Sequence, residues 1–137
     1  MPTSTTLRAL ALKSLAEAEA LLRTGHWDGA YYLAGYAAER ALKAIIADQF
    51  TGNAIPDRRR VESTYTHSIP RLVDLAGLKP TLDLASEDVH FRQYWETIKE
   101  WSENSRYSEW TDAEAGAIVE ALADPKNGIL RWIRAHW

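Results

Sequence analysis

Small apolar residues recur at helical spacing between Trp27 and Phe50, the longest helical pattern in the chain. They form two neighbouring stripes, because positions three and four residues apart share one face of a helix. One stripe consists of Ala30, Ala34, Ala37, Ala41 and Ala44, and the other of Tyr31, Gly35, Ala38, Leu42 and Ile45. So wide an apolar surface predicts a central helix whose small side chains let neighbouring helices approach closely.

The residues before this segment predict another long helix. Apolar positions with helical spacing run from about residue 5 to residue 23, where Thr5 or Thr6 can cap the first turn and Gly25 can end the helix. The connection to the central helix is short, and Asp28 can cap the start of that helix. Two long helices joined this tightly are expected to pack as an antiparallel pair.

The second half of the chain alternates shorter helical patterns with breaks. We expect helices over residues 68–77, over 89 to about 103, from Thr111 onward and over 129–137. Residues 52–66, 78–84 and 103–110 lack the helical period and are predicted to be a loop, a connector and a non-helical corner. The pattern as a whole predicts an all-α, up-and-down helical bundle of about four main helices plus short ones, in one domain spanning residues 1–137.

Composition narrows the class of protein. The chain has 137 residues, of which 46% are hydrophobic and 26% charged, which suits a folded globular domain. It contains no cysteine, which excludes disulfides and thiolate metal sites. Its beginning does not resemble a signal peptide, and no apolar run is long enough to cross a bilayer, so we expect a cytoplasmic protein without a membrane partner.

Charge and histidine placement limit the chemistry further. The net charge of -3 gives no general affinity for nucleic acid, so such binding would need a local basic patch. The most basic stretch is Arg58–Arg60, which is either a solvated surface run or a phosphate-contacting loop. The four histidines lie far apart, and the chain has neither a glycine-rich phosphate loop nor a nucleophilic serine elbow. We therefore expect neither a metal site nor a cofactor.

The segment W-D-G-A-Y-Y-L-A-G-Y-A-A-E-R-A-L-K-A, residues 27–44, resembles the second helix of HEPN-domain proteins, which are small all-helical domains. The resemblance extends to an alanine-rich first helix, to the pair Thr66-His67 and to the pair Arg106-Tyr107 before the last long helix. It implies a HEPN-type bundle that forms a homodimer. The family includes RNases, toxins and partner-binding subunits, and its genes often accompany a small nucleotidyltransferase. The resemblance thus implies a nucleotidyltransferase, RNA or a nucleotide as possible partners.

Catalytic HEPN ribonucleases carry an Arg, a polar residue directly after it, and a His after about four to six intervening residues. The His can move a proton and the Arg can stabilise the phosphate charge without a metal. Arg106 is the corresponding candidate catalytic residue here, but Tyr107 follows it and no His lies within range. The catalytic motif is therefore interpreted as degenerate. Two other Arg/His spacings, Arg131 with His136 and Arg60 with His67, are attributed to chance.

Glu39, His67 and Tyr107 are candidate ligand-binding residues. His67 is either a capping or core-edge residue or a contact to RNA or nucleotide near the cleft. Glu39 lies on the apolar segment, where it can pair with Lys43 one turn on. A buried Glu39 would instead need a firm partner such as Arg106, and this pair would fix the central helix against the Arg-Tyr corner. Alternatively, Glu39, Arg106 and Tyr107 form a polar cluster that opens to a ligand cleft.

These residues leave three functions open. The first is a protein that binds a nucleotide, RNA or a partner protein and whose catalytic motif is degenerate. The second is a metal-independent RNase toxin of a HEPN/nucleotidyltransferase toxin–antitoxin pair, with Arg106 in the reaction. The third is a purely structural interaction subunit.

Overall fold

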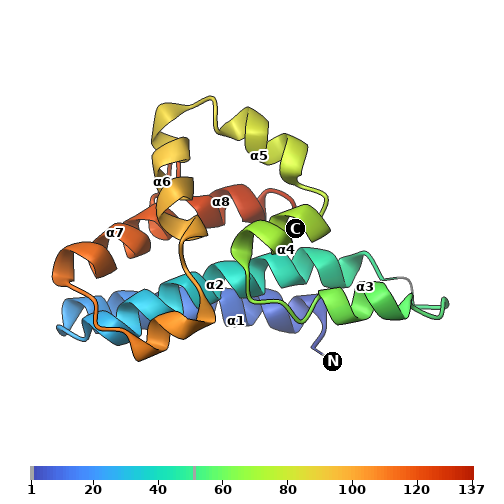
Figure 1. The fold of residues 1–137 in the computed structure, drawn as a ribbon, viewed down its shortest axis with the longest axis horizontal. Coiled ribbons are helices and arrows are strands. Elements are labelled where there is room, and N and C mark those ends of the chain that lie inside the picture. Colours follow the sequence, from blue (N-terminus) through green and yellow to red (C-terminus); the bar gives the residue numbers. More distant parts are fainter. Residues whose placement is uncertain (1, 51) are drawn as a thin grey trace.

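The computed structural model describes residues 2–50 and 52–137, and every regular element within these ranges is a helix (Figure 1). This confirms the predicted all-α fold. The elements are α1 (Ser4–Arg23), α2 (Trp27–Asp48), α3 (Arg58–Ser63), α4 (Ile69–Leu75), α5 (Lys79–Ala85), α6 (Val89–Lys99), the 3-10 helix η1 (Glu103–Tyr107), α7 (Asp112–Ala123) and α8 (Ile129–Arg134).

The two longest helices, α1 and α2, lie side by side and antiparallel along the long axis of the molecule (Figure 1). Gly25 ends the first of them with a φ of 81°, a left-handed conformation that favours glycine. The predicted cap of α1 is wrong, because the side chain of Thr3 accepts the hydrogen bond from the backbone N–H of Thr6 at 3.2 Å. The helix therefore begins two to three residues earlier than a cap at Thr5 or Thr6 would place it.

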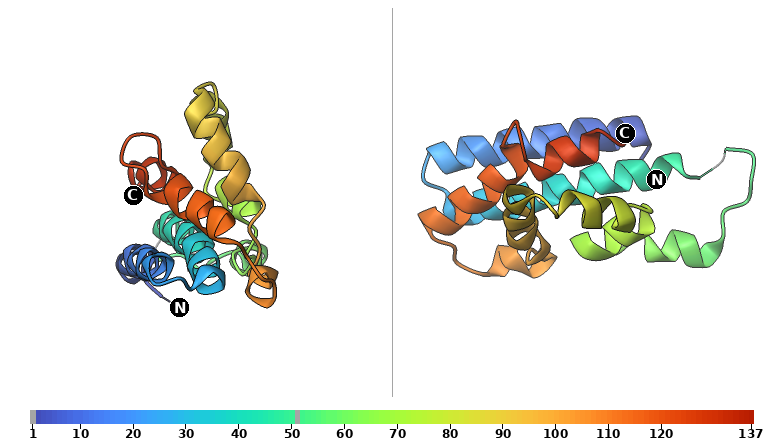
Figure 2. Two further views of the ribbon diagram at one scale, coloured as in Figure 1. Left: turned by 90° about the vertical axis from the view of Figure 1, so that its left-hand side faces the viewer. Right: turned by 90° about the horizontal axis from the view of Figure 1, so that it is seen from above.

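Helix α2 is the central element. All ten residues of its two predicted stripes are buried, so neighbours cover both stripes. Figure 2 shows α1 and α7 on two sides of α2, with α6 rising away from this layer. Glu39 is the charged residue buried in this helix, with 2% of its surface exposed. The apolar pattern was sufficient to find the helix, whereas this buried carboxylate needs partners from other elements.

Asp28 does not cap α2 as predicted. The residue at the N-cap is His26, which makes no side-chain capping bond, and the Asp28 carboxylate instead accepts a hydrogen bond from the backbone N–H of Trp110 at 2.6 Å. The Trp110 ring also stacks on Tyr31, with ring centroids 3.6 Å apart. These contacts fasten the segment after η1 to the first turns of α2.

Three segments predicted to be non-helical contain short helices. The predicted loop 52–66 contains α3, the connector 78–84 contains most of α5, and the corner 103–110 contains η1. Elements of five to seven residues are too short to display a helical period, so the sequence pattern could not reveal them. In α5, moreover, a proline at the start of the helix resembles a break although proline is well tolerated there.

Two of the predicted helix ends are also displaced. Helix α6 ends at Lys99 rather than near residue 103, and α2 ends at Asp48 rather than at Phe50. After α6 the chain turns inward so that Trp101 is buried against α2. Burial of this large ring thus takes precedence over continuation of the helix.

The last part of the chain packs back onto the α1–α2 pair. Helices α7 and α8 lie over α2 (Figure 1), and the indole N–H of Trp137 donates a hydrogen bond to the Ala41 carbonyl at 3.1 Å. Buried residues of α1, α2, α4, α6, α7 and α8 form one continuous hydrophobic core. No helix within the described residues is long and apolar enough to cross a membrane.

Helix α7 begins with the predicted capping box. The hydroxyl of Thr111 accepts from the backbone N–H of Glu114 at 3.1 Å, and the Glu114 carboxylate accepts from the backbone N–H of Thr111 at 3.1 Å. We expect Thr111→Ala to lower the free energy of unfolding by about 1 kcal/mol, the usual contribution of such a cap. Urea denaturation followed by circular dichroism measures this, and an unchanged midpoint would show that the cap contributes nothing.

Candidate functional site

The corner that carries Arg106 rests on a glycine of the central helix. A side chain at Gly35 would collide with the five-membered ring of Trp101, which fills the space beside the α2 backbone. Trp101 is buried, and η1 begins two residues after it. The contact between Gly35 and Trp101 therefore sets the position of η1 on α2, and with it the position of Arg106 and Tyr107.

Arg106 lies between two tyrosine rings. Its guanidinium carbon is 5.0 Å from the centroid of the Tyr107 ring and 6.0 Å from that of Tyr32, both within cation–π range. The Tyr107 hydroxyl raises the pKa of the Arg106 guanidinium above its ordinary value. Burial raises the pKa of Tyr32, so its phenol stays neutral. Arg106 forms no ion pair with a carboxylate of the described residues, and its positive charge is therefore available to a ligand.

Aromatic side chains continue from this corner along one face of α2. Tyr32, Tyr36 and Arg40 follow one another at intervals of four residues, which places them in a row along the helix. The ring centroids of Tyr32 and Tyr36 are 5.7 Å apart, and the Trp101 ring lies 5.9 Å from Tyr32. The Arg40 guanidinium lies 4.1 Å from the centroid of Tyr36. Two tyrosine rings of α2 thus lie in a row between the guanidinium groups of Arg106, on η1, and Arg40.

His67 joins three separate segments of the chain. Its Nδ1 is 2.7 Å from Glu39 Oε1 on α2, and its Nε2 is 3.2 Å from Glu103 Oε2 on η1. We call Glu39, His67 and Glu103 the His67 clamp. The other carboxylate oxygen of Glu39 lies 3.5 Å from Lys43 Nζ, one turn along the helix. Through these contacts the clamp holds the segment before α4 against α2 and η1.

The predicted pairing of Glu39 with Arg106 is wrong. Among the described residues, the ion-pair partners of Glu39 are His67 and Lys43, so the alternative pairing with Lys43 is present. His67 comes from a segment between short helices, and no periodicity in the sequence indicates where it lies. The structure brings His67 and Arg106 to the two ends of the same element, since Glu103 begins η1 and Arg106 stands near its end.

Residues of the two Arg/His spacings that were attributed to chance have partners elsewhere in the protein. His136 Nδ1 is 2.9 Å from the Trp132 carbonyl oxygen, and Arg131 donates to the Lys126 carbonyl at 3.0 Å. Arg60 donates to the side-chain oxygen of Gln49. These contacts give the residues structural roles at helix ends.

The basic run at residues 58–60 is part of α3 rather than a free loop. Arg58 pairs with Glu62 at 2.8 Å, and Arg60 lies 5.7 Å from the centroid of the Phe50 ring. Two of the three guanidinium groups thus have partners within the protein. This arrangement favours the interpretation as a solvated surface run over that as a phosphate-contacting loop, although the run is helical.

Sequence reasoning missed Tyr32, Tyr36 and Glu103. The interval of four residues between the two tyrosines is visible in the sequence and could have indicated an aromatic row on α2. Glu103 carried no such signal, because its role depends on how η1 folds back. No group of His, Asp and Glu side chains in the described residues has a geometry suited to a metal ion.

The fold and this corner define a small all-helical bundle with an exposed arginine between aromatic rings. The family model described as the HEPN domain matches residues 5–126, which is most of the chain. The chain therefore belongs to the HEPN domain family, and membership supports a general nucleotide- or RNA-related function. No curated protein and no solved structure matched the chain. Helix α8 lies beyond the matched residues but packs on α2 and α7.

Proposed function

We propose that this protein binds RNA or a nucleotide at the corner formed by Arg106, Tyr107 and Tyr32, without cleaving it. The observation that carries this proposal is the Arg106 guanidinium between two tyrosine rings with no carboxylate partner among the described residues. A guanidinium of this kind can donate two hydrogen bonds to a phosphate. An exposed tyrosine offers a face on which a base can stack, and Tyr107 is 76% exposed.

The contacts of His67 support binding without cleavage. General-base catalysis needs a nitrogen that is free to accept a proton from the reacting hydroxyl. Both nitrogens of His67 face carboxylates, Glu39 on one side and Glu103 on the other. Tyr107, moreover, occupies the position after Arg106 where catalytic relatives carry a different polar residue. Arg106 can hold a phosphate here, but His67 is already engaged by two carboxylates and is not free to act as a base.

We also propose that the protein forms a homodimer and works with a small nucleotidyltransferase, in a pair resembling a toxin–antitoxin system. This proposal rests on what accompanies related HEPN proteins and on the six Trp and six Tyr of the chain, which exceed the needs of so small a core. A dimer that placed two Arg106 corners side by side would double the length of RNA that the protein can contact.

The binding proposal predicts a loss of affinity in Arg106→Ala. We expect a short labelled single-stranded RNA to bind about tenfold more weakly, because one charge-assisted contact to a phosphate is lost. Tyr107→Ala is expected to weaken binding by a similar factor through the loss of stacking. Fluorescence anisotropy at low salt measures both, and adenosine monophosphate serves as a second probe.

Arg134→Ala is the matched control, since Arg134 lies 5.5 Å from the centroid of the Trp137 ring on another part of the surface. Its affinity for RNA should equal that of the unchanged protein. Equal affinity of all three variants would contradict the proposed site. If the unchanged protein cleaved RNA without metal and Arg106→Ala did not, the RNase function would replace the binding function.

A further inference from the structure

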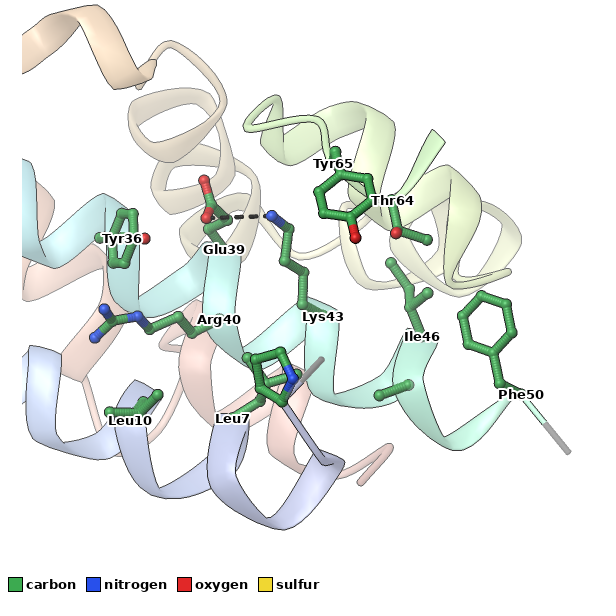
Figure 3. Close-up of a pocket in the computed structure, with 12 residues that line it drawn as sticks. Leu7, Leu10, Tyr36, Glu39, Arg40, Lys43, Ile46, Phe50, Thr64 and Tyr65 are labelled. Atoms are coloured by element: carbon green, nitrogen blue, oxygen red, sulfur yellow. Dashed lines mark ion pairs between the residues drawn. The ribbon is translucent and has the colours of Figure 1, made fainter. Parts of the chain in front are cut away.

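A cavity of about 290 Å³ lies between α1, α2 and the residues that follow α3, and neither Arg106 nor Tyr107 lines it (Figure 3). Its walls are mostly apolar and include Leu7 and Leu10 from α1, Ile46 from α2, and Phe50 just after α2. This volume is close to the lower limit of small-molecule sites, which is about 300 Å³. It is therefore large enough for a small organic ligand and too small for a strand of RNA.

Arg40 brings an oriented positive charge to the cavity. One guanidinium nitrogen, Nη1, donates a hydrogen bond to the buried hydroxyl of Ser14 at 2.6 Å, and the group lies over the Tyr36 ring. Figure 3 shows the Arg40 side chain extending toward Tyr36 and Leu10, which also line the cavity. The Ser14 contact fixes the guanidinium, so its remaining N–H groups keep a defined direction.

Lys43 brings a second positive charge whose hydrogen bonding is incomplete. Its side chain is only 21% exposed, and its ammonium is 3.5 Å from Glu39 Oε2 (Figure 3). It makes no hydrogen bond to any of the described residues. By contrast Lys79, at the same spacing from Asp83, lies at 2.8 Å and is hydrogen-bonded. An ammonium with unused donors at the wall of a mostly apolar cavity can donate to an additional acceptor there.

The charges of the cavity are not balanced by its own residues. Two cations, Arg40 and Lys43, line the cavity together with one carboxylate, Glu39. One oxygen of this carboxylate contacts His67, which does not line the cavity. An apolar enclosure with excess positive charge is complementary to a ligand that combines an apolar body with a negative group.

We propose that this cavity binds a small organic anion, a carboxylate with an aromatic or aliphatic body. The carboxylate accepts hydrogen bonds from Lys43 and from the free edge of Arg40, and the body packs on Leu7, Leu10 and Phe50. The proposal is independent of the RNA or nucleotide function, because it uses neither Arg106 nor Tyr107. Such a ligand would be a metabolite-sized acid rather than a nucleic acid.

Three probes that differ only in their end group test this proposal. 4-Phenylbutyrate, its neutral amide and 4-phenylbutylamine are titrated into the full chain, and binding is measured by ligand-observed NMR and calorimetry. We expect the carboxylate to bind about tenfold more tightly than the amide, as one charge-assisted hydrogen bond provides, and the amine not to bind. Equal affinity for the carboxylate and the amide, or no binding of the carboxylate, would overturn the proposal.

Variants locate the binding. Lys43→Gln should reduce the preference for the carboxylate over the amide to what Arg40 alone provides, whereas Lys79→Gln, at an exposed pair with the same spacing, should leave this preference unchanged. Ala47→Phe should block both probes by filling the cavity from a partly exposed helix position. Circular dichroism confirms that each variant is folded. Carboxylate binding that survives both Lys43→Gln and Ala47→Phe would place the site elsewhere and contradict the proposal, while RNA affinity should be unchanged in Ala47→Phe.

Discussion

Gly35→Ala is expected to lower the free energy of unfolding by about 2–3 kcal/mol. The new methyl group would overlap the Trp101 ring, which is buried and cannot turn aside without moving η1. Overpacking of this kind typically costs about 1–3 kcal/mol and occasionally more, and the better helix propensity of alanine returns up to about 1 kcal/mol. Urea denaturation monitored by circular dichroism measures the change.

Gly116→Ala provides the matched control for this prediction. Gly116 lies in the middle of α7, where a methyl group would meet no atom within 4 Å. We expect this variant to be more stable than the unchanged protein by about 0.5–1 kcal/mol, from helix propensity alone. The same substitution, glycine to alanine, should therefore lower the free energy of unfolding in α2 and raise it in α7. If Gly35→Ala were as stable as Gly116→Ala, Trp101 would not be held against the α2 backbone.

Gly35→Ala should also weaken RNA binding. The displaced indole would shift η1, and Arg106 and Tyr107 would leave their positions beside Tyr32. Anisotropy measurements well below the unfolding midpoint separate this effect from loss of folded protein. Weaker RNA binding by this variant would show that the contact between Gly35 and Trp101 maintains the geometry of the proposed site.

Glu39→Gln is expected to lower the free energy of unfolding by about 2 kcal/mol. The change retains the shape of the side chain but removes the charge that His67 and Lys43 share. Breaking a fully buried ion pair costs about 3–5 kcal/mol, and the expected loss is smaller because the side chains of His67 and Lys43 are 38% and 21% exposed to water. Chemical denaturation at neutral pH measures the difference.

Glu103→Gln tests the other half of the His67 clamp. Glu103 is 50% exposed and 3.2 Å from His67 Nε2, so its pair is screened by solvent. We expect this variant to lose less than about 1 kcal/mol. A loss as large as that of Glu39→Gln would show that the exposed carboxylate is as important to the clamp as the buried one.

The sequence predicted the helices whose apolar period is long enough to recognise. The two stripes of α2 and the capping box at Thr111 depend on residues at most four positions apart, so local spacing defines them. The short helices α3, α5 and η1 offer no such local spacing, because five to seven residues are too few to display a helical period. For the same reason the pairing of Glu39 with His67 could not be predicted, since these residues are 28 positions apart and joined through irregular chain.

The residues of the candidate site also divide into those that the sequence identified and those that only the fold revealed. Arg106 and Tyr107 could be identified from their place before the last long helix, and the structure puts them on η1. That they face Tyr32 follows from the contact between Trp101 and Gly35, and a glycine in a helical stripe does not reveal which ring will cover it. The aromatic neighbours of Arg106 therefore emerged only from the fold.

The segment that carries Arg106 is fastened at both of its ends. Trp101 is inserted against Gly35 before it, and after it Trp110 is stacked on Tyr31 and bonded to Asp28. A recognition element anchored in this way keeps its bound shape before any ligand arrives. Association then requires little ordering of the chain, and most of the attraction of each phosphate or base contact remains as affinity.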